Sequence, residues 1–165
     1  MTPAAVTPAA VKPALVAPRA ALAYHDSQRI TLPRALTALQ AWQHIMANPL
    51  PGMALAFRIR DAISARFGVQ RIGGFSGAPV AQVAPGDKLD FFLVEAARPD
   101  QLVLTARDRH LDVMISVDTA GRDLAITASV VTHNRFGRAY MLPVGPAHRL
   151  IVALMQRRLR RRLAG

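Results

Sequence analysis

Histidines and the polar residues near them are the parts of this sequence that could carry chemistry. His110 and Asp112 are two residues apart, so on a strand their side chains point to the same side and could act as an acid–base pair. Apolar residues alternate on the opposite face of that strand, from Leu111 to Val117. If the apolar face lines the interior, His110 and Asp112 face solvent. The spacing therefore leaves both a site role and a structural role open.

Another polar group falls at residues 133–140, where a strand pattern gives way to a helix pattern. His133 and Arg138 could hold an anion such as a carboxylate or a phosphate, because the amides of a helix start and an arginine fork both favour negative charge. The alternative is that His133 and Asn134 cap the helix and fix the turn. Tyr140 either reaches an interior cavity with its hydroxyl or packs its ring.

His148 and Arg149 lie further along the same helix pattern. Arg149 could pair with an acidic residue of a strand or hold the charged head group of a ligand. The five histidines lack the short spacing of metal ligands and the chain has no cysteine, so we expect no metal ion and no cofactor. The residues expected to contact a ligand are Arg138, Tyr140, His148, Arg149, His133 and His110.

Positive charge is concentrated at the C-terminal end of the chain. The 165 residues carry a net charge of +11, and aromatic residues make up only 5%. The basic end could be a solvated helix terminus, a contact for an anionic membrane surface or a contact for nucleic-acid phosphates. We expect no sequence-specific nucleic-acid binding, because side chains that stack on bases are scarce. The arginines concerned are Arg157, Arg158, Arg160, Arg161 and Arg162.

Residues 1–22 form a Pro/Ala-rich segment, and residues 23–165 follow as one domain. Prolines recur every five residues in the first segment, which predicts an extended, disordered tail. An export signal is the alternative, although its start would be basic and its apolar run unbroken. The longest apolar stretch, residues 139–155, is interrupted by prolines and by Arg149, so we expect no membrane span. We expect a cytoplasmic protein that could also lie peripherally on a membrane.

Hydrophobic periodicity predicts an α+β domain with two helices after the first strand. The long C-terminal helix is predicted over 138–163, with a kink near 143–146. The second helix carries an apolar stripe of Leu55, Ile59, Ile63 and Phe67. Each late strand has one apolar and one wetter face, so we expect a curved antiparallel sheet wrapped around the long C-terminal helix. The other predicted elements are strands over 24–30, 89–97, 101–107, 110–119 and 122–133, and helices over 34–47 and 53–67.

Four short blocks of the sequence carry a resemblance to a known superfamily. They are residues 24–27 (YHDS), 108–112 (DRHLD), 133–140 (HNRFGRAY) and 146–151 (PAHRLI). With this element order, residues 24–163 resemble the helix-grip superfamily, which includes START lipid-transfer domains, birch-pollen-allergen-like proteins and polyketide cyclases. More closely, the chain resembles an uncharacterised bacterial domain family of that superfamily. Some members of that family are fused behind an NAD(P)-binding Rossmann domain.

The resemblance implies a helix-grip fold and a small apolar or amphipathic ligand, lipid- or polyketide-like, in an internal cavity. It implies no catalytic residue, because fold alone does not decide function. Binding without catalysis is the favoured interpretation, since it is the commoner role in the superfamily. Two alternatives stay open: a cyclase- or dehydratase-like enzyme that uses a cavity histidine, and an accessory module of an NAD(P)-dependent oxidoreductase. No Gly-x-Gly-x-x-Gly motif of a Rossmann domain is present in this sequence.

Overall fold

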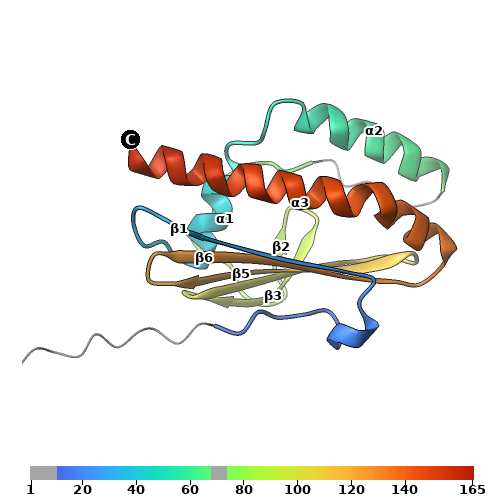
Figure 1. Ribbon diagram of the computed structural model, residues 1–165, viewed down its shortest axis with the longest axis horizontal. Coiled ribbons are helices and arrows are strands. Elements are labelled where there is room, and N and C mark those ends of the chain that lie inside the picture. Colours follow the sequence, from blue (N-terminus) through green and yellow to red (C-terminus); the bar gives the residue numbers. More distant parts are fainter. Residues whose placement is uncertain (1–10, 68–73) are drawn as a thin grey trace, which may run out of the picture.

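In the part of the chain that the structure describes, six antiparallel strands form one curved sheet in the order β1-β6-β5-β4-β3-β2 (Figure 1). A computed structural model describes residues 11–67 and 74–165 of the chain. The first strand pairs with the last along its whole length, from Tyr24 opposite Val130 to Thr31 opposite Asp123. The strands are β1 Tyr24–Thr31, β2 Lys88–Leu89, β3 Phe92–Arg98, β4 Gln101–Arg107, β5 Leu111–Ala120 and β6 Asp123–Thr132.

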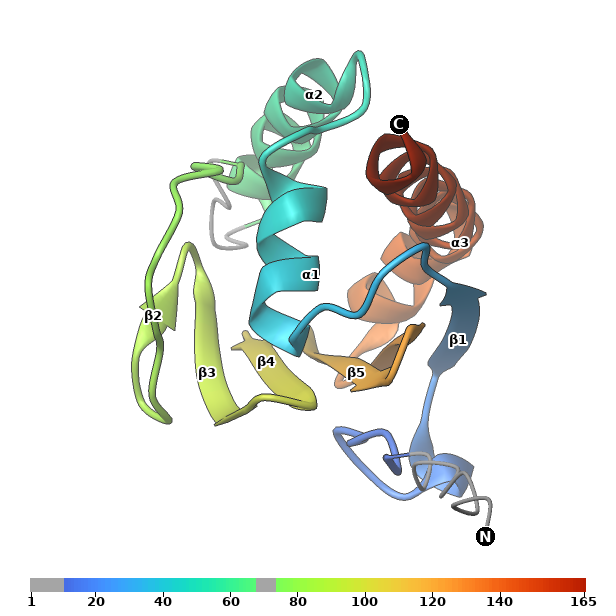
Figure 2. The same cartoon turned by 90° about the vertical axis from the view of Figure 1, so that its left-hand side faces the viewer.

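The three α-helices found within residues 11–67 and 74–165 lie on one side of the sheet, which gives the domain two layers (Figure 2). The helix α1 lies against β4 and β5, and α3 runs along β1 and β6. Apolar residues of the sheet face these helices: Ile115 stands opposite Ala128, Val117 stands opposite Ile126, and all four are buried. The helices are α1 Ala38–Met46, α2 Met53–Arg66 and α3 Arg135–Ala164, with a short 3-10 turn η1 at Arg19–Ala21. The predicted α+β class and helix-grip arrangement are confirmed.

Two predicted elements differ most from the structure. The first helix begins at Ala38 rather than at residue 34, because Thr37 and Gln40 form a capping box that sets its start. In that box the Gln40 N–H donates to Thr37 Oγ1 at 3.2 Å, and the Thr37 N–H donates to Gln40 Oε1 at 3.0 Å. The single strand predicted over 89–97 is a hairpin of β2 and β3, which turns at Asp90 with a left-handed φ of 55°.

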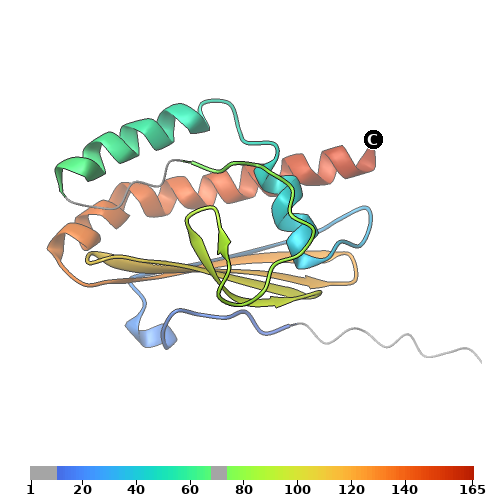
Figure 3. The ribbon, with the colours of Figure 1, turned by 180° about the vertical axis from the view of Figure 1, so that it is seen from behind.

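The face of the sheet opposite the helices is polar and is covered by residues 11–23 (Figure 3). The N–H of Ala14 donates to Ser116 Oγ at 3.2 Å, and the N–H of Val16 donates to Ser129 Oγ at 3.0 Å. Residues 11–22, part of the segment that the prolines predicted to be a disordered tail, thus lie along the sheet. The reason is that N–H groups left between the prolines find buried serine acceptors. Residues 1–10 of that predicted tail lie outside the described residues.

Asp118 is buried beneath this N-terminal segment. Its carboxylate accepts hydrogen bonds from Gln101 Nε2 at 2.7 Å and from Ser116 Oγ at 2.9 Å. Burial raises the pKa of Asp118 above its ordinary value, and the two hydrogen bonds oppose that rise. Gln101 Nε2 also donates to the carbonyl of Lys12 at 3.1 Å, so the amide links the sheet to the segment that covers it.

Helix α3 is continuous from Arg135 to Ala164, and it contains Pro143 and Pro146 within its length. The side chain of Asn134 caps its start by accepting from the N–H of Gly137 at 3.0 Å. Each proline removes one helix hydrogen bond and so frees the carbonyl four residues earlier, at Ala139 and Leu142. Both of those residues are exposed, so water can replace the lost bonds. The predicted kink near 143–146 therefore does not interrupt the helix.

Helix α2 turns most of its predicted apolar stripe to solvent. Leu55 and Ile59 are 59% and 53% exposed, and Phe67 is 49% exposed. The residues that α2 buries instead are Met53 and Ser64. The side chain of Ile63, the fourth member of the stripe, lies outside the described part of the structure. A four-residue spacing thus identified one face of the helix, but that face does not point to the core.

Substitution of Gly137 by alanine should destabilise the domain, because α3 meets the sheet at this residue. A Cβ there would lie 2.3 Å from the carbonyl oxygen of His110, which is backbone and cannot move alone. We expect Gly137→Ala to lower the free energy of unfolding by about 1–3 kcal/mol, measured by urea denaturation. The control Ala139→Ser, at an exposed position of the same helix, should unfold with the wild-type protein. Equal stability of both variants would contradict this account of the contact.

Candidate functional site

His110 lies in a hydrogen-bonded junction between the β4–β5 turn and the start of α3. Its Nδ1 lies 2.9 Å from Nδ2 of Asn134, and its Nε2 lies 3.1 Å from Nε of Arg109 and 3.3 Å from the carbonyl oxygen of Phe67. The ring also packs on Phe136, with centroids 4.6 Å apart. Since both ring nitrogens have partners and the side chain is buried, His110 holds this junction together.

Asp112 pairs with His133 and Arg107 on the more exposed side of the same junction. His133 Nε2 lies 3.1 Å from Asp112 Oδ1, and Arg107 donates to Oδ2 at 3.1 Å. The two predicted partners, His110 and Asp112, thus bind different residues. The reason is that β5 begins at Leu111, so strand alternation does not extend to His110. Arg138, which the sequence predicted to hold an anion together with His133, is exposed.

Tyr140 links the two long helices. Its hydroxyl accepts a hydrogen bond from Nε of Arg60 at 3.0 Å, and the guanidinium carbon of Arg60 lies 5.9 Å from the tyrosine ring centroid. The Tyr140 ring stacks with Phe136, which in turn contacts Phe67 at 4.7 Å between centroids. The hydroxyl that could have faced a cavity therefore takes part in the contact between α2 and α3.

A second junction joins α3 to β1, about 16 Å along the helix axis from Gly137. Arg149 Nε donates to Asp26 Oδ1 at 3.0 Å, which is the salt bridge to a strand that the sequence allowed. Gln28 Nε2 donates to Asp26 Oδ2 at 2.6 Å and to the carbonyl oxygen of Arg149 at 2.9 Å. The carboxylate of Asp26 thus receives hydrogen bonds from both the strand and the helix.

His148 lies inside this second junction. Its ring is edge-on to Tyr24, with centroids 6.1 Å apart, and its Nδ1 is buried without a hydrogen-bond partner. Burial lowers the pKa of His148 below its ordinary value, and the nearby Asp26 opposes that change. Burial likewise raises the pKa of Tyr24, whose hydroxyl donates to the carbonyl of Gly145 at 3.1 Å. A neutral imidazole and a neutral phenol therefore lie together here at neutral pH.

Five aromatic rings fill the space between α1, α2 and the β2–β3 hairpin. The ring of Phe75 is at their centre, with centroids 5.9 Å from Trp42, 5.5 Å from Phe57, 5.2 Å from Phe91 and 6.2 Å from Phe92. Trp42 and Phe92 are buried, whereas the other three rings are only half-buried. These five residues are called the aromatic cluster below.

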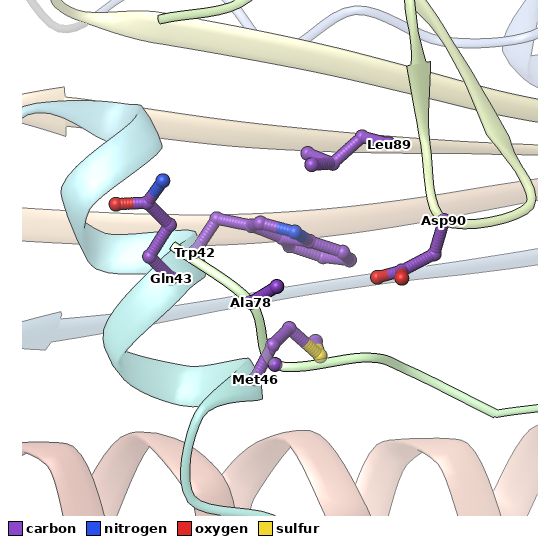
Figure 4. A pocket seen from close by; sticks show the side chains of 7 residues that line it. Trp42, Gln43, Met46, Ala78, Leu89 and Asp90 are labelled. Carbon is purple, nitrogen blue, oxygen red and sulfur yellow. The ribbon is translucent and has the colours of Figure 1, made fainter. Parts of the chain in front are cut away.

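A small pocket opens beside the aromatic cluster (Figure 4). It has a volume of about 10 Å³, room for about one water molecule. Typical ligand sites measure roughly 300–1,000 Å³, so in this conformation the cluster takes the space that a ligand would need. The pocket is lined by Trp42, Gln43, Met46, Gly77, Ala78, Leu89 and Asp90.

None of the residues predicted to contact a ligand belongs to the aromatic cluster. The first junction contains His110 and His133, and the second contains His148 and Arg149. Tyr140 lies in the contact between α2 and α3, and Arg138 is exposed. Phe75 was not predicted as part of a site, because it lies in a glycine-rich stretch where apolar periodicity gives no signal. Its only mark in the sequence is an isolated aromatic residue among glycines. The polar partners Tyr24 and Asp26 were likewise missed, since they lie far from His148 and Arg149 in sequence.

Comparison with known proteins identifies the family of this chain. A family model described as "Protein of unknown function (DUF2867)" matches residues 19–155. The chain belongs to the DUF2867 family. No curated protein and no solved structure matches it. In this DUF2867 protein, the matched part contains both junctions and the aromatic cluster, whereas the arginine-rich last turns of α3 lie beyond it.

Within residues 11–67 and 74–165, no three His, Asp or Glu side chains gather where they could hold one metal ion. None of the helices in that part of the chain has the length and apolar composition needed to cross a membrane.

Burial of a neutral His148 should make stability fall in mild acid. The unfolded chain takes up a proton below the ordinary histidine pKa of about 6.5, whereas the folded protein resists protonation because its pKa is lower. We expect Tm to decrease as pH falls from neutral through this window, and His148→Leu to reduce that decrease. Thermal denaturation followed by circular dichroism measures it. The exposed His44 provides the control, and His44→Leu should keep the wild-type slope; an unchanged slope in His148→Leu would rule out this origin.

Proposed function

We propose that this DUF2867 protein binds a small apolar or amphipathic molecule, lipid- or polyketide-like, against the aromatic cluster. The proposed ligand takes the place that Phe75 occupies in this structure. The main support is that the central ring, Phe75, lies outside the helices and strands. Trp42, Phe57 and Phe92 belong to a helix or a strand, whereas Phe75 belongs to the irregular segment 74–87. A ring on an irregular segment can move away while the surrounding elements keep their positions.

The packing around Phe75 supports an exchange of this kind. A ligand that displaces the Phe75 ring would contact the same aromatic side chains that Phe75 contacts now. Its binding free energy must exceed the roughly 1.5–3 kcal/mol that burial of a phenylalanine provides. Phe57, Phe75 and Phe91 are only half-buried, so the cluster is accessible from its outer side. The small pocket at Gly77 and Ala78 lies at the same place and would be the start of an enlarged site.

The alternative of a cyclase- or dehydratase-like enzyme would rest on His148, the one candidate histidine with a buried, unpartnered nitrogen. Close packing at that junction disfavours it. A Cβ at Gly145 would lie only 3.0 Å from the ring of Tyr24, so the helix and the strand leave little space for a substrate. Membership of the helix-grip superfamily is supported by the order of elements. An oxidoreductase partner is supported by the resemblance alone.

The proposal can be tested with the single tryptophan of the chain. Trp42 is buried in the aromatic cluster, 5.9 Å from Phe75, so a molecule that displaces Phe75 should change its fluorescence. We expect dodecanoic acid to change the Trp42 emission in a saturable way, with one molecule bound per chain by native mass spectrometry. Phe75→Ala should bind about 10–100-fold more tightly, because the ligand no longer competes with the ring.

Phe67→Ala is the matched control, since it removes a half-exposed phenylalanine outside the aromatic cluster. It should bind dodecanoic acid as the wild type does. Binding by Phe75→Ala alone, with none by the wild type, would mean only that the substitution creates a cavity, and it would overturn the proposal. So would a wild-type affinity that Phe75→Ala leaves unchanged.

A further inference from the structure

The helical layer carries large apolar side chains that the core does not use. Among the described residues, every large apolar side chain that is exposed to solvent lies on α2, directly after it, or on α3. They are Leu55 (59% exposed), Ile59 (53%), Phe67 (49%), Leu142 (76%), Leu150 (60%) and Leu154 (40%). None lies on the sheet, so the apolar exposure belongs to one side of the molecule.

On α3 these side chains share one outer face. Leu142, Leu150 and Leu154 are four or eight residues apart, and exposed Pro146 lies at the remaining position of the row. The side chains that face the sheet, including Val152, Met155 and Leu159, lie on the opposite side of the helix. The outer row from 142 to 154 therefore spans about 18 Å of helix without a charged residue.

The same layer is strongly basic. Helix α3 contains no acidic residue. The one acidic residue of α2, Asp61, pairs with Arg60, and Arg149 pairs with Asp26 of β1. All the other acidic residues of the chain lie between residues 87 and 123, in the sheet and its turns. The arginines of α3 are Arg135, Arg138, Arg149, Arg157, Arg158, Arg160, Arg161 and Arg162.

We propose that the outer face of α2 and α3 docks on an anionic lipid bilayer. Exposed leucines beside arginines, with no exposed acidic residue on either helix, suit a surface that is negative outside and apolar beneath. Figures 1 and 2 show both helices in the layer away from the sheet, and the bond between Arg60 and Tyr140 holds them together. The leucines enter the headgroup region, and the arginines of the last turns contact lipid phosphates.

Charge and apolar exposure together distinguish an anionic bilayer from a second copy of the chain and from a nucleic acid. A second copy of the chain would bring two arginine-rich helices together without acidic partners on either α3, so self-association through this face is disfavoured. A nucleic acid would match the arginines, but it gives no apolar surface for three exposed leucines. An anionic bilayer satisfies both features. Docking through this face requires no ligand in the interior.

Vesicle flotation with two double variants tests the proposal. The probe is vesicles of equal parts phosphatidylcholine and phosphatidylglycerol, compared with vesicles of phosphatidylcholine alone. The wild type should float only with the anionic vesicles. Arg160→Gln with Arg161→Gln should weaken the apparent affinity about 25-fold, at about fivefold for each arginine. Leu150→Ser with Leu154→Ser should weaken it by about tenfold or more. All four residues are exposed, so the fold should be kept, as circular dichroism can check.

A matched control removes two arginines from the sheet layer. Arg29→Gln with Arg122→Gln lowers the net charge by the same amount at exposed positions of β1 and the β5–β6 turn, and it should float as the wild type does. Equal losses in both arginine pairs would mean that binding follows net charge alone, and would overturn the proposal. So would binding that survives the serine pair, tighter binding to duplex DNA than to vesicles, or a dimer that the serine pair converts to monomer.

Discussion

The close approach of the α3 backbone to the sheet is the constraint on which the rest of this structure depends. At Gly137 the helix touches the carbonyl of His110, and at Gly145 it touches the ring of Tyr24. A side chain at either position would push the helix outward. Two contacts separated by about two turns fix both the position of α3 and its rotation about its own axis. The fixed rotation turns Val152 and Met155 to the core and Leu150 and Leu154 to solvent.

The two faces of the sheet bury different kinds of side chain. The helix side buries apolar residues, whereas the other side buries Ser116, Asp118, Thr127 and Ser129, which need hydrogen-bond partners. Residues 11–23 provide part of these partners from their backbone, and the side chains provide the rest among themselves, as in the 2.8 Å contact between Ser27 and Thr127. A proline-rich segment suits this role, because it stays extended without a ladder of its own. Its few N–H groups match isolated serine acceptors.

The sequence predicted the fold better than the site, for a physical reason. Alternation in β5 and β6 records which side chains face the core, and the strand boundaries at 101–107 agreed with the structure. Helical spacing in α2 identified an apolar face, but spacing cannot tell whether a partner covers it. The environment of His148 depends on Tyr24 and Asp26, more than 120 residues away. The local pattern therefore predicted the same ligand-contact role for His148 and Arg149. In the structure Nδ1 of His148 is buried, whereas the side chain of Arg149 is largely exposed.

Helix α2 connects the interior with the outer surface. Phe57 on this helix contacts Phe75 inside the aromatic cluster, whereas Leu55 and Ile59, two residues to either side, are exposed. The helix contacts α3 through Arg60, near its middle, which bonds Tyr140, and Phe67, directly after the helix, packs on Phe136. The N-terminal half of α2 is anchored to the interior by buried Met53 and by the contact of Phe57 with Phe75. One helix thus presents Phe57 to the aromatic cluster and Leu55 and Ile59 to solvent, so the cluster and the outer face share one structural element.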